Sequence, residues 1–244
     1  MQTTKEIHYN NSSYSENRQK LHKSIIKTLL KNIPNEINEP IAILLGGGAA
    51  SGKSTIGERY QKDLNKFSKK AAYIDSDAIK EQIPEYITLK NTHPMKAAEL
   101  VHDESSDIAS EALDKAIEGR YDIFYDGTMK NKDKYRNLIN KLKGKGYEVF
   151  TVIVDIPLDI AYKRSHDRYL ITQRMVSEHV IKSSHKGVVK TFIELKELFD
   201  GYALWDNSEY GGAGEIFAEK DATGEKVHNE ERLKQFYQKS YIKL

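Results

Sequence analysis

The sequence predicts an α/β fold with a central, mostly parallel sheet that carries helices on both faces. Short apolar runs alternate along the chain with amphipathic stretches of helical length. The first of these runs, residues 41–45, is continuously apolar, which is typical of a strand buried on both faces. No internal repeat and no linker rich in Pro, Gly or Ser interrupts the 244 residues. We therefore expect a single domain over residues 41–244, preceded by an N-terminal arm and helix over residues 1–40.

The expected elements follow one another in a regular order. Residues 1–20 show no period and predict a loose arm, and the apolar side chains of residues 21–30 recur at helical spacing. The remaining strands are expected at residues 41–45, 71–74, 122–125, 148–154 and 202–205. The remaining helices are expected at residues 54–67, 94–117, 132–143, 158–168 and 176–199. Residues 209–244 show no pattern that indicates a function.

Composition excludes several classes of protein. The chain has no cysteine, so it has neither a disulfide framework nor a thiolate metal site. A net charge of +2 is too small for a protein that wraps nucleic acid, so no nucleic-acid partner is expected. The N-terminus lacks the apolar core of a signal peptide, and no apolar run is long enough to span a bilayer. These observations predict a cytoplasmic protein with no membrane association.

A glycine-rich segment directly follows the first strand. Residues 47–54 fit the pattern G-x-x-x-x-G-K-[ST] in full, with a strand before them and a helix after them. Glycines let the backbone turn so that its N–H groups point at phosphate oxygens, and the helix N-terminus adds partial positive charge. The pattern predicts a P-loop that binds ATP through Gly47, Gly48, Ala49, Ala50, Ser51, Gly52, Lys53, Ser54 and Thr55.

The same loop contains residues that could bind the ATP phosphates and Mg²⁺. Lys53 can reach the β- and γ-phosphates of ATP, and the Ser54 hydroxyl is placed to bind Mg²⁺. The third predicted strand ends in Asp126, next to the P-loop, where a carboxylate can organise Mg²⁺ through its water shell. A turn aspartate before Gly127 is the alternative interpretation. The predicted cofactors are therefore ATP and Mg²⁺, in a P-loop kinase fold.

Further acidic residues lie where an acceptor could bind. The second strand ends at Asp75 and Asp77, and one of them could take the proton of an attacking hydroxyl while the other caps a helix. Glu104, Asp107 and Glu111 share one face of the expected helix 94–117. For this helix a solvated charged edge is the commoner explanation.

Arginines follow the fourth strand. Arg164 and Arg168 lie one helical turn apart, and Arg174 comes six residues after Arg168. Arginines in this position suit a lid that neutralises a phosphoryl group during transfer. A surface helix with charge pairs is the alternative, and it is the interpretation we favour for Arg164. No guanine-reading N-K-x-D is present, because residues 131–134 read Asn-Lys-Asp-Lys, so a small kinase is favoured over a GTPase.

Over residues 41–208 the chain resembles the zeta toxin family of P-loop kinases. The resemblance rests on LLGGGAASGKS, YIDSDAIK, SEALDKAIEGRYDIFYDGT, the arginines after Pro157, and WDNS. It implies an Arg-bearing lid, an antitoxin partner, and UDP-N-acetylglucosamine as the acceptor, phosphorylated on its 3′-hydroxyl. By position it makes Asp77 the catalytic base and lets Glu111 contact the sugar or assist that base. The resemblance also implies that Arg168 and Arg174 bind the phosphates in the transition state of transfer.

The chain departs from the family pattern at two places. The segment between Arg168 and Arg174 is shorter than the usual lid, and Asp126 stands where a glutamate also occurs in the family. Some relatives phosphorylate nicotinamide dinucleotides. Two alternatives therefore stay open: a kinase for a nucleoside, dinucleotide or antibiotic, or a non-catalytic ATP-binding module that docks partners through the helix at residues 21–30.

Overall fold

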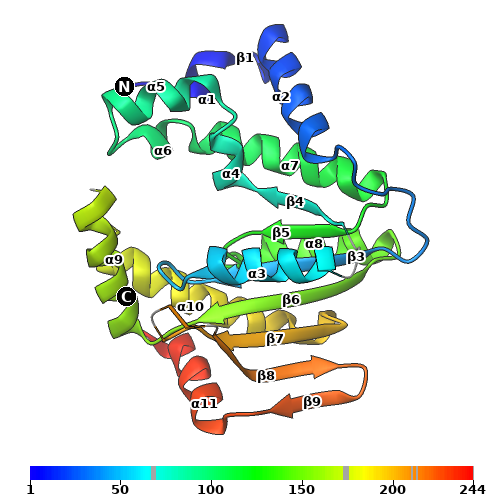
Figure 1. Cartoon of the computed structure of the whole chain (residues 1–244), viewed down its shortest axis with the longest axis vertical. Helices are drawn as coiled ribbons and strands as arrows, with labels where there is room; N and C mark the ends of the chain where they lie inside the picture. Colours follow the sequence, from blue (N-terminus) through cyan, green and yellow to red (C-terminus); the bar gives the residue numbers. More distant parts are fainter. Residues whose placement is uncertain (67–69, 173–175, 210, 213, 244) are drawn as a thin grey trace.

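The computed structural model describes residues 1–66, 70–172, 176–209, 211–212 and 214–243. Its centre is a seven-stranded sheet in the order β4-β5-β3-β6-β7-β8-β9 (Figure 1). Neighbouring strands from β4 to β7 pair in parallel, which confirms the predicted fold class. The parallel strands are β3 (Ile41–Gly47), β4 (Ala72–Asp75), β5 (Ile123–Asp126), β6 (Glu148–Asp155) and β7 (Gly201–Asp206).

The continuous apolar run in β3 is buried on both faces, as expected for a central strand. Ala42 and Leu44 pack into the larger apolar cluster, and Ile43 and Leu45 pack into a second one. Successive side chains of a strand point to opposite faces, so these two clusters lie on opposite sides of the sheet.

Each face of the sheet is covered by helices. The smaller cluster receives Ile56 from α3 (Lys53–Lys66), whereas the larger one receives side chains from more helices. These helices are α2 (Glu16–Leu29), α4 (Ser76–Lys80), α7 (His102–Glu118), α8 (Lys132–Gly144), α10 (Glu178–Leu195) and α11 (Glu230–Gln238). After β6, helix α9 (Leu158–Thr172) lies beside α10 at the end where the parallel strands stop (Figure 1). In the described part of the chain, no helix combines the length and apolarity that crossing a membrane requires.

The chain beyond β7 adds structure that the sequence did not reveal. Strands β8 (Glu215–Asp221) and β9 (Gly224–Val227) extend the sheet in antiparallel pairing. Both strands are mixed in polarity, and β9 has only four residues, so neither shows the continuous apolar run that marks a central strand. Helix α11 and the short turn Lys239–Tyr241 (η2) then pack back against α10 and β8.

The prediction of a loose arm over residues 1–20 is wrong. These residues form α1 (Thr4–His8), a small hairpin of β1 (Tyr9–Asn10) and β2 (Ser13–Tyr14), and the start of α2 (Glu16–Leu29). Ile25 and Ile26 of α2 are buried in the larger apolar cluster, so this apolar stripe packs inside the molecule and is not a free docking surface. Elements of two or five residues are too short to produce a period in the sequence.

The prediction of one helix over residues 94–117 is also wrong. The segment contains α6 (Ala97–Leu100) and α7, and α5 (Pro84–Thr92) precedes them. Pro84 occupies the first turn of α5, where a missing N–H costs nothing. Pro94 follows His93, whose extended φ of −143° ends α5. Together with α1 and α2, these helices form the upper part of the molecule (Figure 1).

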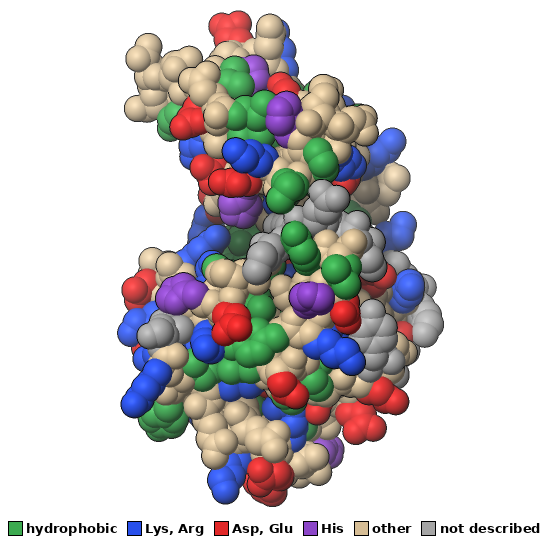
Figure 2. Space-filling model, turned by 90° about the vertical axis from the view of Figure 1, so that its left-hand side faces the viewer, with side chains coloured by type: hydrophobic (Ala, Val, Ile, Leu, Met, Phe, Trp, Pro, Cys, Tyr) green, Lys and Arg blue, Asp and Glu red, His purple; other side chains and the backbone are tan. Residues whose placement is uncertain are grey.

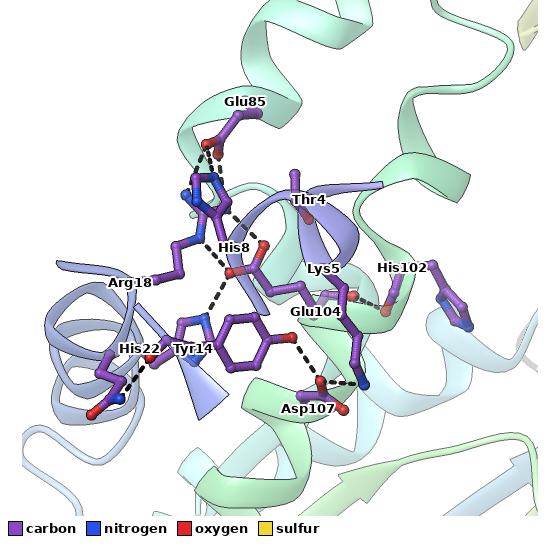
Figure 3. Close-up of polar contacts among 12 residues, drawn as sticks. Thr4, Lys5, His8, Tyr14, Arg18, His22, Glu85, His102, Glu104 and Asp107 are labelled. Carbon is purple, nitrogen blue, oxygen red and sulfur yellow. Dashed lines mark hydrogen bonds and ion pairs between the residues drawn. The ribbon is translucent and has the colours of Figure 1, made fainter. Parts of the chain in front are cut away.

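A buried ion cluster joins the N-terminal segment to α7 and α5 (Figure 3). Glu104 of α7 is fully buried and accepts hydrogen bonds from the Arg18 guanidinium, at 2.5 and 2.7 Å. Nε2 of His22 lies 2.7 Å from the same carboxylate, and Arg18 also bonds both oxygens of Glu85. Asp107 accepts from the Tyr14 hydroxyl at 2.7 Å. Lys5 also pairs with Asp107 at 2.7 Å, so the N-terminal segment neutralises the acidic face of α7 at both Glu104 and Asp107.

This cluster predicts an acid-sensitive contribution to stability. Burial by itself would raise the pKa of Glu104, but hydrogen bonds from Arg18, His22 and Thr4 lower it from 4.5 to about 2. A carboxylate with a depressed native pKa stabilises the fold above its unfolded pKa, and that stabilisation is lost as the pH falls through the native value. Glu104→Gln should lower the free energy of unfolding by roughly 3 kcal/mol near neutral pH, because Arg18 loses its buried anion.

Urea unfolding between about pH 7 and pH 3 checks this expectation. The gap between Glu104→Gln and the unmodified chain should narrow as the pH falls below about 5. Asp114→Asn is a matched control on the same helix, because Asp114 pairs with Lys141 at an exposed site. An equal effect of both substitutions at every pH would contradict the expectation.

Candidate functional site

The P-loop runs from the end of β3 to the first turn of α3. Ala50 and Gly52 have positive φ angles of 62° and 79°, which turns the backbone back on itself before the helix begins. A Cβ on Gly52 would lie 2.2 Å from Nδ2 of Asn207, so glycine is required there for both its conformation and its size. Ser54 and Thr55 are exposed at the start of α3.

Neighbouring elements hold this loop through its backbone. The Ala49 N–H donates to Oγ of Ser184 at 2.9 Å, and Nε2 of His185 lies 3.0 Å from the Ala49 carbonyl oxygen. Nδ2 of Asn207 donates to the Ser51 carbonyl at 2.9 Å. The sequence analysis missed these three residues as parts of the site. Asn207 lies in the WDNS segment that contributed to the family resemblance, but the two α10 residues carry no sequence signal.

Two strand-end aspartates face the P-loop lysine. Asp75 and Asp126 are direct neighbours across β4 and β5, at the carboxyl ends of both strands. Lys53 forms an ion pair with the buried Asp126, which also accepts from the Tyr73 hydroxyl at 3.1 Å. Burial lowers the pKa of Lys53, although Asp75 and Asp77 act in the opposite direction. Burial also raises the pKa of Asp75, and the nearby Asp77 adds to that rise.

Asp75 and Asp77 have different local roles. Oδ1 of Asp75 accepts from the Asp77 N–H at 2.8 Å and so caps the short helix α4 (Ser76–Lys80). The Asp77 side chain is 69% exposed and forms an ion pair with the buried Lys80 at 2.6 Å. Capping therefore accounts for Asp75, whereas Asp77 is exposed and lines the cavity next to the P-loop lysine.

These residues line one cavity of about 360 Å³ at the carboxyl end of the sheet. Figure 2 views this end of the molecule, where the outline narrows between the N-terminal helices and the rest of the chain. Lys53, Asp77 and Asp126 are brought together here, as the sequence predicted for neighbouring strand ends. The full lining is Lys53, Asp75, Ser76, Asp77, His102, Ser106, Ala109, Tyr125, Asp126, Gly127, Thr128, Lys130, Asn131, Lys134 and Tyr135.

The far wall of the cavity comes from the start of α8. Lys130, Asn131 and Lys134 lie there, and the Asn131 side chain caps the helix by accepting from the Lys134 N–H. Tyr135 is 3% exposed, and its hydroxyl has no hydrogen-bond partner among the described residues. The sequence analysis missed this wall because lysines in a loop before a helix are ordinary surface residues.

The structure does not bring every predicted site residue to this cavity. Glu111 pairs with Lys115 of its own helix at 2.9 Å and is not part of the cavity lining, because the α7 residues that line it are His102, Ser106 and Ala109. Arg168 is exposed on α9, and Arg174 lies outside the described residues. The roles that the resemblance gives to Glu111, Arg168 and Arg174 stay predictions.

Arg164 lies nearer the P-loop than the sequence analysis expected. Its Nη1 would be 3.6 Å from a Cβ on Gly52. Its Nη2 donates to the carbonyl oxygens of residues 207, 208 and 209, at 2.8 to 3.3 Å. This guanidinium therefore links α9 to the segment after β7, beside the loop that is expected to hold phosphate.

Comparison with known proteins identifies the family. The zeta toxin family profile matches residues 26–209, which is more than half of the chain. The chain belongs to the zeta toxin family. Its curated relatives include the toxin PezT of Streptococcus pneumoniae, 30% identical over 54% of this chain and 51% of that protein. A calmodulin calcium-dependent NAD kinase of Arabidopsis thaliana is 26% identical over 79% of this chain and 45% of that protein. The chain thus spans about half the length of these two curated relatives.

Solved structures share the fold. The pneumococcal PezAT toxin–antitoxin structure aligns with a TM-score of 0.65 and 23% identity, over 80% of this chain and 79% of that chain. The AvrRxo1-ORF1:-ORF2 structure with ATP aligns with a TM-score of 0.71 and 17% identity, over all of this chain and 84% of that one. At these identities the likeness establishes the fold alone. The AvrRxo1 alignment also covers the residues before 26 and after 209, which lie outside the match to the family profile.

The crowding at Gly52 gives a testable expectation. Gly52→Ala should weaken ATP binding at least about tenfold, because its Cβ would meet Asn207 and its positive φ disfavours any side chain. Gly144→Ala is a matched control, since a Cβ there meets nothing within 4 Å. Calorimetric titration with ATP and Mg²⁺ checks both variants, and unchanged affinity in Gly52→Ala would contradict the geometry.

Proposed function

We propose that this chain is a kinase that transfers the γ-phosphate of ATP to a hydroxyl of a nucleotide-containing acceptor, with UDP-N-acetylglucosamine as the first candidate. The observation that carries the proposal is the shared cavity of Lys53 and Asp77. A phosphate-binding lysine and a proton-accepting carboxylate open onto the same space. Phosphoryl transfer asks the protein mainly for positioning and charge stabilisation, and these two groups supply both.

The donor side is the P-loop. ATP phosphates would lie against the backbone N–H groups of residues 47–55 and the N-terminus of α3. In the free chain, Lys53 pairs with Asp126 in a buried setting that lowers the pKa of the lysine. Bound phosphate offers Lys53 a second anion, so the lysine can move from the aspartate to the β- and γ-oxygens.

The acceptor side is the wall around Asp77. Its carboxylate would orient the attacking hydroxyl and take its proton as the bond to phosphorus forms. Lys130 and Lys134 line the same cavity, so an acceptor that carries phosphate groups of its own would be matched in charge. Sugar nucleotides and dinucleotides both have this chemistry.

Mg²⁺ suits the donor set beside the P-loop. The Ser54 hydroxyl and the Asp126 carboxylate are hard oxygen ligands, which is the chemistry that Mg²⁺ prefers. When bound, Mg²⁺ would neutralise negative charge on the phosphates. Lys53, Arg168 and Arg174 would add to that neutralisation during transfer.

A second acceptor class follows from one comparison. The Arabidopsis relative named as an NAD kinase aligns over a larger share of this chain than PezT does. We therefore include a nicotinamide dinucleotide as the alternative acceptor. An antitoxin partner and a cytoplasmic location remain part of the proposal, and the PezAT and AvrRxo1 complexes are structural precedents for a bound partner.

The decisive experiment measures ADP release from ATP and Mg²⁺ with no acceptor, with UDP-N-acetylglucosamine, and with NAD. The proposal expects acceptor-dependent release and a product heavier by one phosphate. The mass of the product identifies the acceptor. ADP release that no acceptor stimulates, together with tight ATP binding, would instead support a non-catalytic ATP-binding module.

Two substitutions separate nucleotide binding from transfer. Lys53→Ala should cut transfer by about 10²–10³-fold through lost charge stabilisation. Asp77→Asn should leave the Kd for ATP within about twofold and cut transfer by about 10²–10⁴-fold. Asp114→Asn, on the exposed side of α7, is the control and should retain full activity. Transfer at the unmodified rate in Asp77→Asn would remove Asp77 from the proposed role.

A further inference from the structure

A buried charged network connects the end of the chain to the P-loop. Its members are Asp155 at the end of β6, His185 of α10, Arg232 of α11 and Lys239 of η2. Their side chains are all less than 10% exposed, and none of them lines the cavity described above. Two members, Arg232 and Lys239, belong to the C-terminal segment, for which the sequence alone indicates no function.

Asp155 is the centre of this network. Both of its oxygens accept from Nζ of Lys239, at 2.6 and 2.7 Å, and Oδ2 accepts from Nη2 of Arg232 at 2.6 Å. Arg232 also donates to Asp206, the neighbour of Asp155 across β6 and β7, at 2.9 Å. Burial alone would raise the pKa of Asp155, but His185, Lys239 and Arg232 hold it well below its usual range. A carboxylate this deeply buried therefore stays ionised.

His185 lies between Asp155 and the phosphate loop. A carbonyl oxygen can only accept, so the Nε2 atom 3.0 Å from the Ala49 oxygen carries a proton. Nδ1 faces Oδ1 of Asp155 at 3.6 Å and has no hydrogen-bond partner among the described residues. The imidazole also lies against Gly48, where an added Cβ would be 2.3 Å from its ring. Both the hydrogen bond and the ring contact fix the backbone of residues 48–49.

We propose that the C-terminal segment at residues 230–241 is a built-in support that positions the P-loop. Lys239 and Arg232 hold Asp155, the Asp155 carboxylate packs against the Nδ1 side of the His185 ring, and His185 fixes the loop in the shape that binds phosphate. These four are positioning residues and do not touch the acceptor cavity. The expected effect of this support on ATP affinity rests on the proposed function. Its expected effect on the order of residues 48–52 does not.

Hydrogen exchange of the ligand-free chain tests the support directly. His185→Ala should speed exchange of the amides at residues 48–52 by about tenfold or more, while exchange in the strands stays unchanged. This variant leaves Asp155 with Lys239 and Arg232, so no buried charge loses its cation partners. His185→Gln should restore much of the protection, because its amide can donate to Ala49.

Lys239→Met tests the distant end of the network. It should speed exchange at residues 48–52 although Lys239 contacts none of them, and Lys239→Arg should reduce the effect. Lys132→Met is the control, since Lys132 forms an exposed ion pair with Glu194 of α10. Unchanged exchange in His185→Ala and Lys239→Met, or an equal change in Lys132→Met, would overturn the proposal.

Calorimetry with ATP and Mg²⁺ gives the functional readout on the same variants. The Kd for ATP should rise about tenfold in His185→Ala and by less in His185→Gln. In the ADP-release assay, the KM for the acceptor should be unchanged in both variants. Wild-type affinity in His185→Ala would overturn the link to ATP binding. If the unmodified chain bound no ATP, the proposed function would fail, and the exchange data would still decide whether the support exists.

Discussion

The fold depends on how it neutralises a row of carboxylates at one edge of its sheet. Four of the five parallel strands, β4, β5, β6 and β7, end in an aspartate. Parallel strands place their carboxyl ends side by side, so Asp75 lies directly across from Asp126, and Asp155 directly across from Asp206. Carboxylates removed from water require cations or hydrogen-bond donors, and each of these four aspartates has at least one such partner. Both the cavity beside Lys53 and the C-terminal segment lie next to these aspartates.

The two halves of the row are neutralised in different ways. Arg232 forms ion pairs with Asp155 and Asp206, and Lys239 pairs with Asp155; of these four side chains only that of Asp206 is partly exposed. Asp126 receives Lys53, a lysine that bound phosphate would also attract, and Asp75 caps α4. The half at β4 and β5 is therefore open to ligand, whereas the half at β6 and β7 is closed. This asymmetry explains why the cavity lies over only one side of the P-loop.

The upper part of the molecule follows the same electrostatic rule. Glu104 is fully buried on α7, and the N-terminal segment provides Arg18 and His22 to it. Arg18 also reaches Glu85 on α5, so a single guanidinium holds three elements together. His102, in the first turn of α7, lines the cavity that contains Lys53 and Asp77. The N-terminal segment thus supports the helix from which one wall of the cavity is built.

The sequence by itself determined the parallel sheet, the P-loop and the strand-end acids Asp77 and Asp126. These features depend on short-range patterns: an apolar run for a buried strand, glycines for a tight turn, and acids directly after strands. The tertiary structure decided the rest. These features include the ordered N-terminus and the antiparallel strands β8 and β9. They also include the hydrogen bonds of His185 with Ala49 and of Lys239 with Asp155, which join residues far apart in the chain. A lysine or histidine in a helix has the same local pattern at the surface as in a buried ion pair, so only the folded chain reveals which charge it meets.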